Sequence, residues 1–291
     1  MIHQPVMVQE FLNFLPLSPN PLLLLDCTLG FGGHTLAFLE KYPDGSVLGM
    51  DRDSEILELT RAHLQDKAER VAIHHADFTE LETLLKAAPK KPDVILMDLG
   101  ISSYQLDQSN RGFSFQQDGP LDMRMDPTQS FTAQDILETY SQEQLAEVLW
   151  KYGDERFSRQ IARKIIEVRK KHPLQTTQQL AQLICSVYRK RTKIHPATRT
   201  FQALRIEVNQ ELETLENGLD AAFHSLDSGG RLIVISFHSG EDRIVKNKFR
   251  FYQKELKKFE LLTKKPRTPS LEEIHQNSRS RSALMRAGVK L

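Results

Sequence analysis

The residues with the clearest chemical potential lie in a glycine turn and at an acidic position downstream of it. The turn reads Asp26-Cys27-Thr28-Leu29-Gly30-Phe31-Gly32-Gly33-His34 and separates an apolar run from a helical pattern. Glycines at such a turn allow close approach of the backbone to a ligand and tolerate a positive φ. Asp51 ends the next apolar run, 21 positions after Gly30, where a carboxylate can bind both hydroxyls of a ribose. These residues predict a nucleoside site.

Two further motifs follow the third and fourth apolar runs. Ala76-Asp77-Phe78 is placed to flank an adenine, and Asp98-Leu99-Gly100 ends the fourth run. A dinucleotide site uses G-x-G-x-x-G because a pyrophosphate sits on the helix N-terminus, whereas the spacing here is G-x-G-G. An adenosyl ligand without a pyrophosphate favours S-adenosylmethionine as the cofactor. The alternative is another doubly wound enzyme, such as an NAD-dependent one, whose fingerprint this sequence lacks.

The elements that must position these motifs alternate between strand and helix. Strands are predicted over 22–26, 47–51, 71–74 and 94–99, and helices over 34–41, 54–65 and 79–87. This succession predicts a parallel sheet covered by helices on both faces. All four motifs then lie at the carboxyl ends of strands, where open α/β sheets bind ligands. Ser54 is expected to cap the second of these helices.

The pattern changes after Asp98 and later resumes. Residues 102–131 are rich in Ser, Gln, Asp, Gly and Pro, and only helices are predicted next, over 133–140, 142–150, 155–170 and 177–188. The alternation returns with a helix over 210–226, a strand over 231–236, a helix over 242–258 and strands near 261–262 and 282–287. We therefore expect an α/β class I S-adenosylmethionine-dependent methyltransferase fold, with a doubly wound, mostly parallel seven-stranded sheet formed by residues 1–106 and 207–291. Residues 107–206 would form an inserted helical, basic, substrate-recognition domain.

Composition excludes several other classes of protein. The chain has 291 residues, 40% hydrophobic and 26% charged, which is ordinary for a globular protein. It contains no apolar run of the roughly 18 to 20 residues that a membrane span needs, and its first residues do not read as a signal peptide. Cys27 and Cys185 are far apart, and neither a metal spacing nor a disulfide framework is visible. We expect a cytoplasmic protein without metal and without a membrane partner.

The charges are strongly segregated although the net charge is only +1. The segment from Arg156 to Arg205 carries +12, the segment from Gly240 to Leu291 carries +8, and the remainder carries −19. Such asymmetry favours a polyanionic partner for the basic segments. The alternative is that these lysines and arginines only decorate solvated helix faces.

Several longer stretches resemble one family, the bacterial 16S rRNA (cytosine-N4)-methyltransferases of the RsmH/MraW family. The similarity extends from about His3 to Arg286. The stretches that carry it are Gly30 to His34, Met50 to Asp53, Leu96 to Ser103, Gln105 to Asp107, Arg111 to Phe115, Asp118 to Met125, His195 to Arg205 and Ser236 to Ser239. The resemblance implies methyl transfer to the exocyclic N4 of a cytidine in 16S rRNA, at the ribosomal decoding region. It leaves open whether naked rRNA or the 30S subunit is the substrate, and whether the chain forms a homodimer.

The resemblance also implies roles for single residues, at the positions of this sequence that match the family's motifs. The implied cofactor contacts are Gly32, Gly33, His34, Asp51, Phe78, Asp98 and Gln105. Two departures are visible. Gly240 stands where the family usually has Leu in Ser-Phe-His-Ser-Leu-Glu-Asp, and the segment between Lys258 and Asn277 is short.

Methylation of an amino nitrogen sets the demands on the catalytic residue. The lone pair of the cytosine amino group is delocalised into the ring, so a catalyst must accept its hydrogens and hold it in line with the methyl group. Many amino-methyltransferases carry Asp/Ser/Asn-Pro-Pro-Tyr/Phe after the fourth strand, whereas this chain has Asp98 followed by Leu-Gly-Ile. Asp98 is the catalytic candidate, as cofactor ligand, amino-group acceptor or both. His34 either acts as a base or shapes the cofactor loop, and His238 either covers the target pocket or is structural.

Basic and aromatic residues of the insert are candidates for RNA contact. Phosphate contacts are expected for Arg163, Arg189, Lys190, Arg191, Lys193 and Arg199, together with Arg156, Arg159 and Arg169. Phe113 and Phe115 are candidates for stacking on an unpaired base, whereas Phe201 fits core packing.

Two other functions remain as alternatives, a methyltransferase acting on DNA or protein and a binding-only RNA chaperone on a degenerate methyltransferase fold. The missing Pro-Pro motif disfavours the first, and the intact glycine turn disfavours the second.

Overall fold

The structure is a computed structural model that describes residues 5–18, 20–86, 88, 90–188 and 192–291. The chain divides into two compact units, which we call the sheet unit (Met1–Gly100 and Leu212–Leu291) and the helical unit (Ile101–Glu211). The boundaries expected from sequence, at 106/107 and 206/207, lie six and five residues from these divisions.

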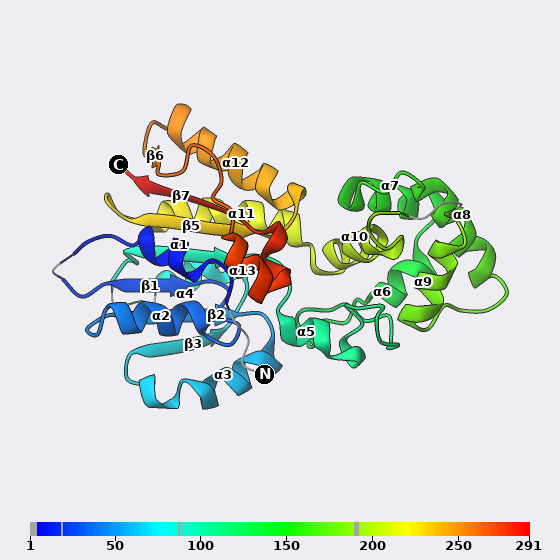
Figure 1. Ribbon diagram of the computed structural model, residues 1–291, viewed down its shortest axis with the longest axis horizontal. Helices are drawn as coiled ribbons and strands as arrows, with labels where there is room; N and C mark the ends of the chain where they lie inside the picture. Colours follow the sequence, from blue (N-terminus) through cyan, green and yellow to red (C-terminus); the bar gives the residue numbers. More distant parts are fainter. Residues whose placement is uncertain (1–4, 19, 87, 89, 189–191) are drawn as a thin grey trace. The chain divides into compact units, whose positions relative to one another are not determined.

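A seven-stranded sheet in the order β3-β2-β1-β4-β5-β7-β6 forms the centre of the sheet unit (Figure 1). Its strands are β1 Leu23–Asp26, β2 Ser46–Asp51, β3 Val71–His75, β4 Val94–Asp98, β5 Arg231–Ser236, β6 Phe259–Leu261 and β7 Leu284–Lys290. The first five are parallel, and β7 runs antiparallel between β5 and β6. The order reverses at β1, which lies between β2 and β4, so the ligand crevice of a doubly wound sheet is expected at this point. The expected class I methyltransferase fold is confirmed.

Helices cover both faces of the sheet because the strands are apolar on both sides. They are α1 Val8–Asn13, α2 Gly33–Lys41, α3 Ser54–His63, α4 Leu81–Lys86, α11 Glu211–Ser225, α12 Ser239–Lys254 and α13 Leu271–Gln276. Successive residues of a strand point to opposite faces. Leu24 accordingly packs in a core with Phe11 and Phe38, whereas Leu25 packs in another core with Leu219 and Phe249.

Two helix starts differ from the prediction. The cap of α3 is Asp53 instead of Ser54, because the Asp53 carboxylate accepts hydrogen bonds from the backbone N–H groups of Glu55 and Ile56, at 3.1 and 3.3 Å. Helix α12 starts at Ser239, three residues before the predicted start at Asp242. Its cap is the ring of His238, and histidine is not among the usual capping side chains.

The helical unit has its own apolar core and, among its described residues, no β-strand beyond one isolated bridge between Pro120 and Thr176. Its helices are α5 Ser103–Asp107, α6 Ala133–Thr139, α7 Gln142–Gly153, α8 Ser158–Arg169, α9 Thr177–Cys185 and α10 Ala197–Asn209. The inserted all-helical part of the expected fold is confirmed.

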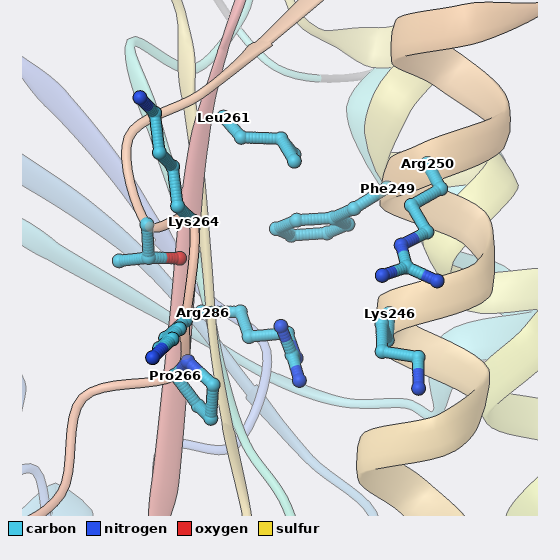
Figure 2. Close-up of a pocket in the computed structure, with 9 residues that line it drawn as sticks. Lys246, Phe249, Arg250, Leu261, Lys264, Pro266 and Arg286 are labelled. Atoms are coloured by element: carbon cyan, nitrogen blue, oxygen red, sulfur yellow. The ribbon is translucent and has the colours of Figure 1, made fainter.

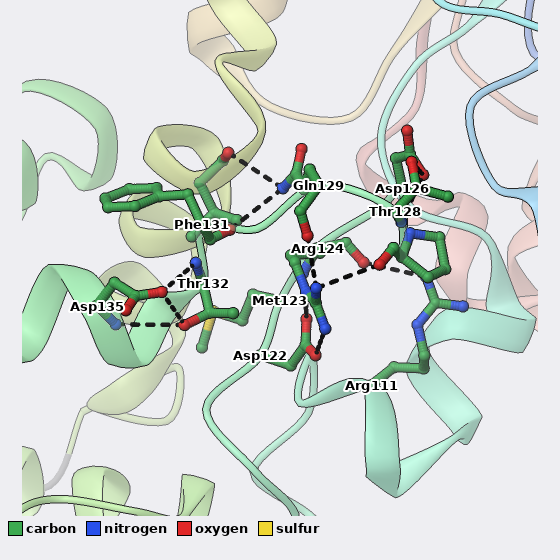
Figure 3. A network of polar contacts seen from close by, with 12 residues as sticks. Arg111, Asp122, Met123, Arg124, Asp126, Thr128, Gln129, Phe131, Thr132 and Asp135 are labelled. Atoms are coloured by element: carbon green, nitrogen blue, oxygen red, sulfur yellow. Dashed lines mark hydrogen bonds and ion pairs between the residues drawn. The ribbon is translucent and has the colours of Figure 1, made fainter.

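Side chains hold the irregular segment between α5 and α6 in place (Figure 3). The Arg124 guanidinium forms two hydrogen bonds to the Asp122 carboxylate, at 2.8 and 2.7 Å, and donates to the Pro127 and Gln129 carbonyls. Asn209 of α10 accepts from the Met125 N–H and donates to the Met123 carbonyl, both at 2.7 Å. This segment is therefore ordered by specific polar contacts although its sequence lacks periodicity.

Candidate active site

Three carboxylates meet at the carboxyl edge of the sheet. Asp26, Asp51 and Asp98 end the adjacent strands β1, β2 and β4. Asp26 pairs in register with Gly49 on one side and Leu96 on the other, so Asp51 and Asp98 each extend two residues beyond it. The result is a notch with Asp26 at its base and an acid on either flank, which we call the acidic notch.

Asp26 is buried at the base of the notch. The Thr35 hydroxyl donates to its Oδ2 at 2.8 Å and the Thr28 N–H to its Oδ1 at 3.3 Å. Burial and, to a lesser extent, the charge of Asp51 raise the pKa of Asp26 against the lowering effect of these hydrogen bonds, and the net value is about 6. This aspartate was not predicted as a site residue, although it begins the glycine turn.

Asp51 fixes the glycine turn. The Gly30 N–H donates to Asp51 Oδ2 at 2.9 Å, and the Asp53 N–H donates to Oδ1 at 3.0 Å. Burial raises the pKa of the Asp51 carboxyl above its usual value. Each carboxylate oxygen can accept more than one hydrogen bond, so Asp51 retains capacity for the two hydroxyls of a ribose.

The three glycines of the turn serve different purposes. A Cβ on Gly32 would lie 2.9 Å from Leu64, and one on Gly33 would lie 2.6 Å from Pro5, so both positions face packed protein. Gly32 also has φ of +77°. A Cβ on Gly30, where φ is +50°, would meet only the Thr28 carbonyl oxygen at 3.9 Å. Gly30 therefore borders open space, and it is the glycine of the turn best placed to let a ligand approach.

Asp98 carries a buried oxygen without a hydrogen-bond partner. Its Oδ1 is inaccessible and unpaired, whereas its backbone N–H donates to the Thr28 hydroxyl at 2.7 Å. Burial, followed by the charges of Asp26 and Glu241, raises the pKa of Asp98 well above its usual value. Buried polar groups are normally hydrogen-bonded, so the orphan oxygen fits a donor supplied by a ligand.

His34 is buried, and its ring lies next to the Asp98 carboxyl group. Its Nε2 lies 2.9 Å from the Val6 carbonyl, which can only accept, so Nε2 carries a proton. Its ring also packs edge-on against Phe11. These contacts fix the ring at the start of α2, which supports its interpretation as a residue that shapes the cofactor loop.

Phe78 and Gln105 have clear structural contacts where they lie. Phe78 is buried, and a Cβ on Gly218 of α11 would come within 2.6 Å of it. Gln105 belongs to the helical unit, where its side chain accepts from the Ser102 N–H at 3.0 Å and completes the capping box that Ser102 begins at the start of α5. Their predicted cofactor contacts remain predictions.

His238 is the cap of α12. Its Nδ1 accepts from the Gly240 and Glu241 N–H groups at 3.2 and 3.4 Å, and its Nε2 lies 3.1 Å from Glu241 Oε1. Glu241 is buried and accepts from the Phe237 N–H at 2.7 Å. A Cβ on Gly240 would lie 3.0 Å from the His238 ring, so the departure from the family pattern adjoins this histidine directly. The contacts support the structural interpretation of His238.

Six of the nine basic residues predicted to contact phosphates fall into three groups. Arg163 is exposed on α8, 3.7 Å from Glu167, and Lys193 is exposed. Arg199 is half-buried and donates to the Asp154 carbonyl at 3.1 Å. The remaining three, Arg189, Lys190 and Arg191, lie outside the described residues.

One prediction for the helical unit is wrong and another stays a prediction. Arg169 donates from Nη1 to the Leu137 and Tyr140 carbonyls, at 2.7 and 2.8 Å, and so satisfies the end of α6, while its expected phosphate contact stays a prediction. Phe113 is 6% exposed in the core of the unit, so its ring is not open to an RNA base. Phe115 is half-buried and stacks on His195 with centroids 4.4 Å apart. Phe201 packs in the core, as predicted.

Two kinds of feature are absent from the described residues. No group of three or more His, Cys, Asp or Glu side chains there could hold a metal ion. Within the same residues, no helix is both long and apolar enough to cross a membrane.

A class I sheet with a glycine turn and an acidic notch at its switch point defines an S-adenosylmethionine-dependent methyltransferase. The model of the MraW methylase family matches residues 1–291, and the chain belongs to that family. It is 48% identical to the ribosomal RNA small subunit methyltransferase H of a Cyanothece species, over 100% of this chain and 95% of that protein. It is 47% identical to the protein of that name from Thermotoga neapolitana, over 98% and 95%. Among solved structures, an rRNA methylase from Streptococcus thermophilus aligns with a TM-score of 0.44 at 14% identity, covering 100% of this chain and 99% of that one.

Proposed function

We propose that this chain methylates the exocyclic N4 of a specific cytidine in 16S rRNA, at the ribosomal decoding region. Its curated relatives are named for the RNA of the small ribosomal subunit. The observation that carries the proposed chemistry is the buried, unpaired Oδ1 of Asp98 at the end of β4. An amino group is a hydrogen-bond donor that such an oxygen would accept.

The acidic notch suits S-adenosylmethionine, which supplies an electrophilic methyl group when bound. Asp51 would accept from the ribose hydroxyls, and Gly30 would let the ligand approach the turn. Asp26 is buried and Asp51 and Asp98 are half-buried, and the pKa values of all three are raised because desolvation destabilises their ionised forms. A ligand with cationic sulfonium and ammonium groups would stabilise these ionised carboxylates, whereas a pyrophosphate would destabilise them further.

Asp98 would act on the acceptor base. Its carboxylate would take a hydrogen bond from the amino group and direct the nitrogen lone pair toward the methyl group, which is catalysis by positioning and electrostatics. The same carboxylate is within the notch and so is also a candidate cofactor ligand. No covalent nucleophile is needed, and Cys27 and Cys185 are left without a catalytic role.

The helical unit would recognise the RNA. Its cluster of +12 between Arg156 and Arg205 attracts phosphates, and such contacts contribute affinity without sequence information. The target cytidine must be splayed out of its RNA structure to reach a pocket. We place the reaction in the cytoplasm, on 16S rRNA within the 30S subunit.

The test is transfer of labelled methyl from S-adenosylmethionine to small subunits from cells that lack this enzyme. The RNA is then digested and its nucleosides are identified by mass spectrometry. N4-methylcytidine at a single site establishes the substrate and the atom together, and naked 16S rRNA in parallel decides between RNA and particle. A different methylated nucleoside, or no transfer despite measurable cofactor binding, would overturn the proposal.

A further inference from the structure

We propose that a basic pocket between α12 and the β6–β7 edge of the sheet unit binds backbone phosphates of the rRNA substrate. This inference rests on the proposed function and adds a second RNA-contacting surface outside the helical unit. The pocket encloses about 210 Å³ (Figure 2). Its lining contains five cations and no acid: Lys246, Arg250, Lys264, Lys265 and Arg286.

Four of the five cations are not neutralised. Arg286 forms two hydrogen bonds to the Asp242 carboxylate, at 2.7 and 3.0 Å, which fix its guanidinium in the wall of the pocket. The other four have no ion pair and no side-chain hydrogen bond with any described residue. Like charges gathered around one hollow create a positive potential that a bound anion relieves. The natural occupant is therefore anionic.

The floor of the pocket favours the phosphate backbone over the bases as the part of RNA that is bound. Phe249 and Thr263 are both buried, and Leu261 is half-buried, so no aromatic face is open for stacking. The exposed groups are the flexible ammonium and guanidinium ends at the rim, which recognise phosphate oxygens. Contacts of this kind contribute position and affinity, not sequence specificity.

The place of the pocket in the sheet favours rRNA among the possible polyanions. Arg286 lies on β7, and β7 pairs with β5, which in turn pairs with β4, the strand that Asp98 ends. Neighbouring strands are about 4.8 Å apart, so β7 lies on the order of 10 Å from β4. Arg286 pairs with Val234, two residues before the carboxyl end of β5. An RNA with its target base at Asp98 can thus extend its backbone to this pocket.

The experiment compares a pocket variant with a charge-matched control in the full chain. The pocket variant is Lys264→Ala with Lys265→Ala, since both side chains are exposed and outside helices and strands. The control is Lys86→Ala with Lys254→Ala, which are equally exposed, unpaired among described residues and outside the pocket lining. Affinity for unmethylated small subunits and for their 16S rRNA is measured from about 50 to 300 mM salt, and S-adenosylmethionine affinity by calorimetry.

Removing two phosphate contacts reduces the slope of log affinity against log salt by about one for each contact. We expect the pocket variant to bind rRNA about tenfold more weakly near 100 mM salt, with a slope reduced by one to two. Its cofactor affinity should match that of the control. An rRNA affinity and slope equal to those of the control would overturn the inference.

Two further outcomes separate the inference from its alternatives. If the pocket variant instead loses binding to vesicles with 30% anionic lipid while its rRNA binding is unchanged, the pocket is a membrane site and the inference is wrong. If the wild-type chain transfers no methyl group to rRNA but the variant still shows the reduced slope, the pocket binds RNA and only the proposed function fails.

Discussion

Asp98 Oδ2 lies 3.8 Å from Nδ1 of His34. Each of the two residues also forms a hydrogen bond with another part of the chain. The His34 Nε2–H donates to the Val6 carbonyl, and the Asp98 backbone N–H donates to the Thr28 hydroxyl. A neutral His34 therefore presents an unprotonated Nδ1 toward the carboxyl group. The carboxyl oxygen that remains without a partner is Oδ1, and this is the atom that a substrate or cofactor donor would meet.

The first prediction concerns Asp98. Replacement by Asn preserves shape but removes a negative charge, and we expect the methyl transfer rate to fall by roughly 10² to 10⁴-fold. Because the pKa of Asp98 is raised, its neutral form is populated at low pH, and this form accepts an amino hydrogen much more weakly than the carboxylate does. The wild-type rate should therefore rise as pH increases through this pKa, and Asp98→Asn should lack that rise.

Single-turnover rates between pH 5.5 and 9 test this prediction. Asp44→Asn, at an exposed position away from the notch, is the matched control and should retain the wild-type profile. An Asp98→Asn enzyme with wild-type cofactor affinity and rate would exclude every role assigned to this carboxylate.

The second prediction concerns stability and Asp26. Its pKa is about 6 in the folded chain against 3.8 for an unperturbed group. The folded state therefore binds a proton more tightly than the unfolded state, and the free energy of unfolding decreases as pH rises from about 4 to 6. The loss is of the order of 3 kcal/mol at pH 7, from about 1.4 kcal/mol for each pH unit.

Asp26→Asn should remove this pH dependence. The Thr28 N–H can still donate to the amide oxygen, and the Thr35 hydroxyl can reverse its role and accept from the amide nitrogen. The variant should gain little stability at pH 4.5 and should be the more stable protein above pH 7. Urea unfolding of both proteins without cofactor measures the difference, and a constant difference across this range would contradict a titrating Asp26.

The third prediction separates two glycines of the same turn. A Cβ on Gly33 collides with Pro5, so Gly33→Ala should lower the free energy of unfolding by about 1–3 kcal/mol. A Cβ on Gly30 meets open space, and Gly30→Ala should cost about 1 kcal/mol for its positive φ alone. Gly30→Ala should nevertheless weaken S-adenosylmethionine binding more than tenfold, because the methyl group occupies space needed by the ligand. Unfolding and calorimetric titration of both variants test the difference, and equal effects on cofactor binding would contradict it.

The sheet and its ligand edge could be predicted because strand periodicity and turn residues act locally. The glycine turn and the acids at the strand ends could be predicted without knowing which distant residues they contact. Other features depend on packing. Phe113 lies in a Gly/Gln-rich segment that resembles a surface loop, yet that segment folds over the core of the helical unit. Asp53 and Ser54 are both good capping residues, and only the backbone geometry decides in favour of Asp53. Asp26 was not predicted as a site residue because its raised pKa arises from burial, which cannot be read from the sequence.

The fourth prediction distinguishes a structural arginine from an RNA-contacting lysine within one basic segment. Arg169 donates to two carbonyls near the end of α6, and an arginine in such a place cannot be told from its neighbours by charge alone. Arg169→Ala leaves those carbonyls without their donor and should lower the free energy of unfolding by about 1–3 kcal/mol. Its effect on the salt dependence of rRNA binding should be small.

Lys193→Ala should show the opposite pattern. Lys193 is exposed and has no ion pair or side-chain hydrogen bond with a described residue, so its loss should leave stability within about 0.5 kcal/mol of wild type. If its ammonium group contacts a phosphate, rRNA binding weakens and the salt slope decreases by about one. Urea unfolding and salt-dependent binding of the two variants form a complete comparison. A reduced slope for Arg169→Ala with an unchanged slope for Lys193→Ala would reverse the two assignments and place the RNA on the side of the helical unit where α6 ends.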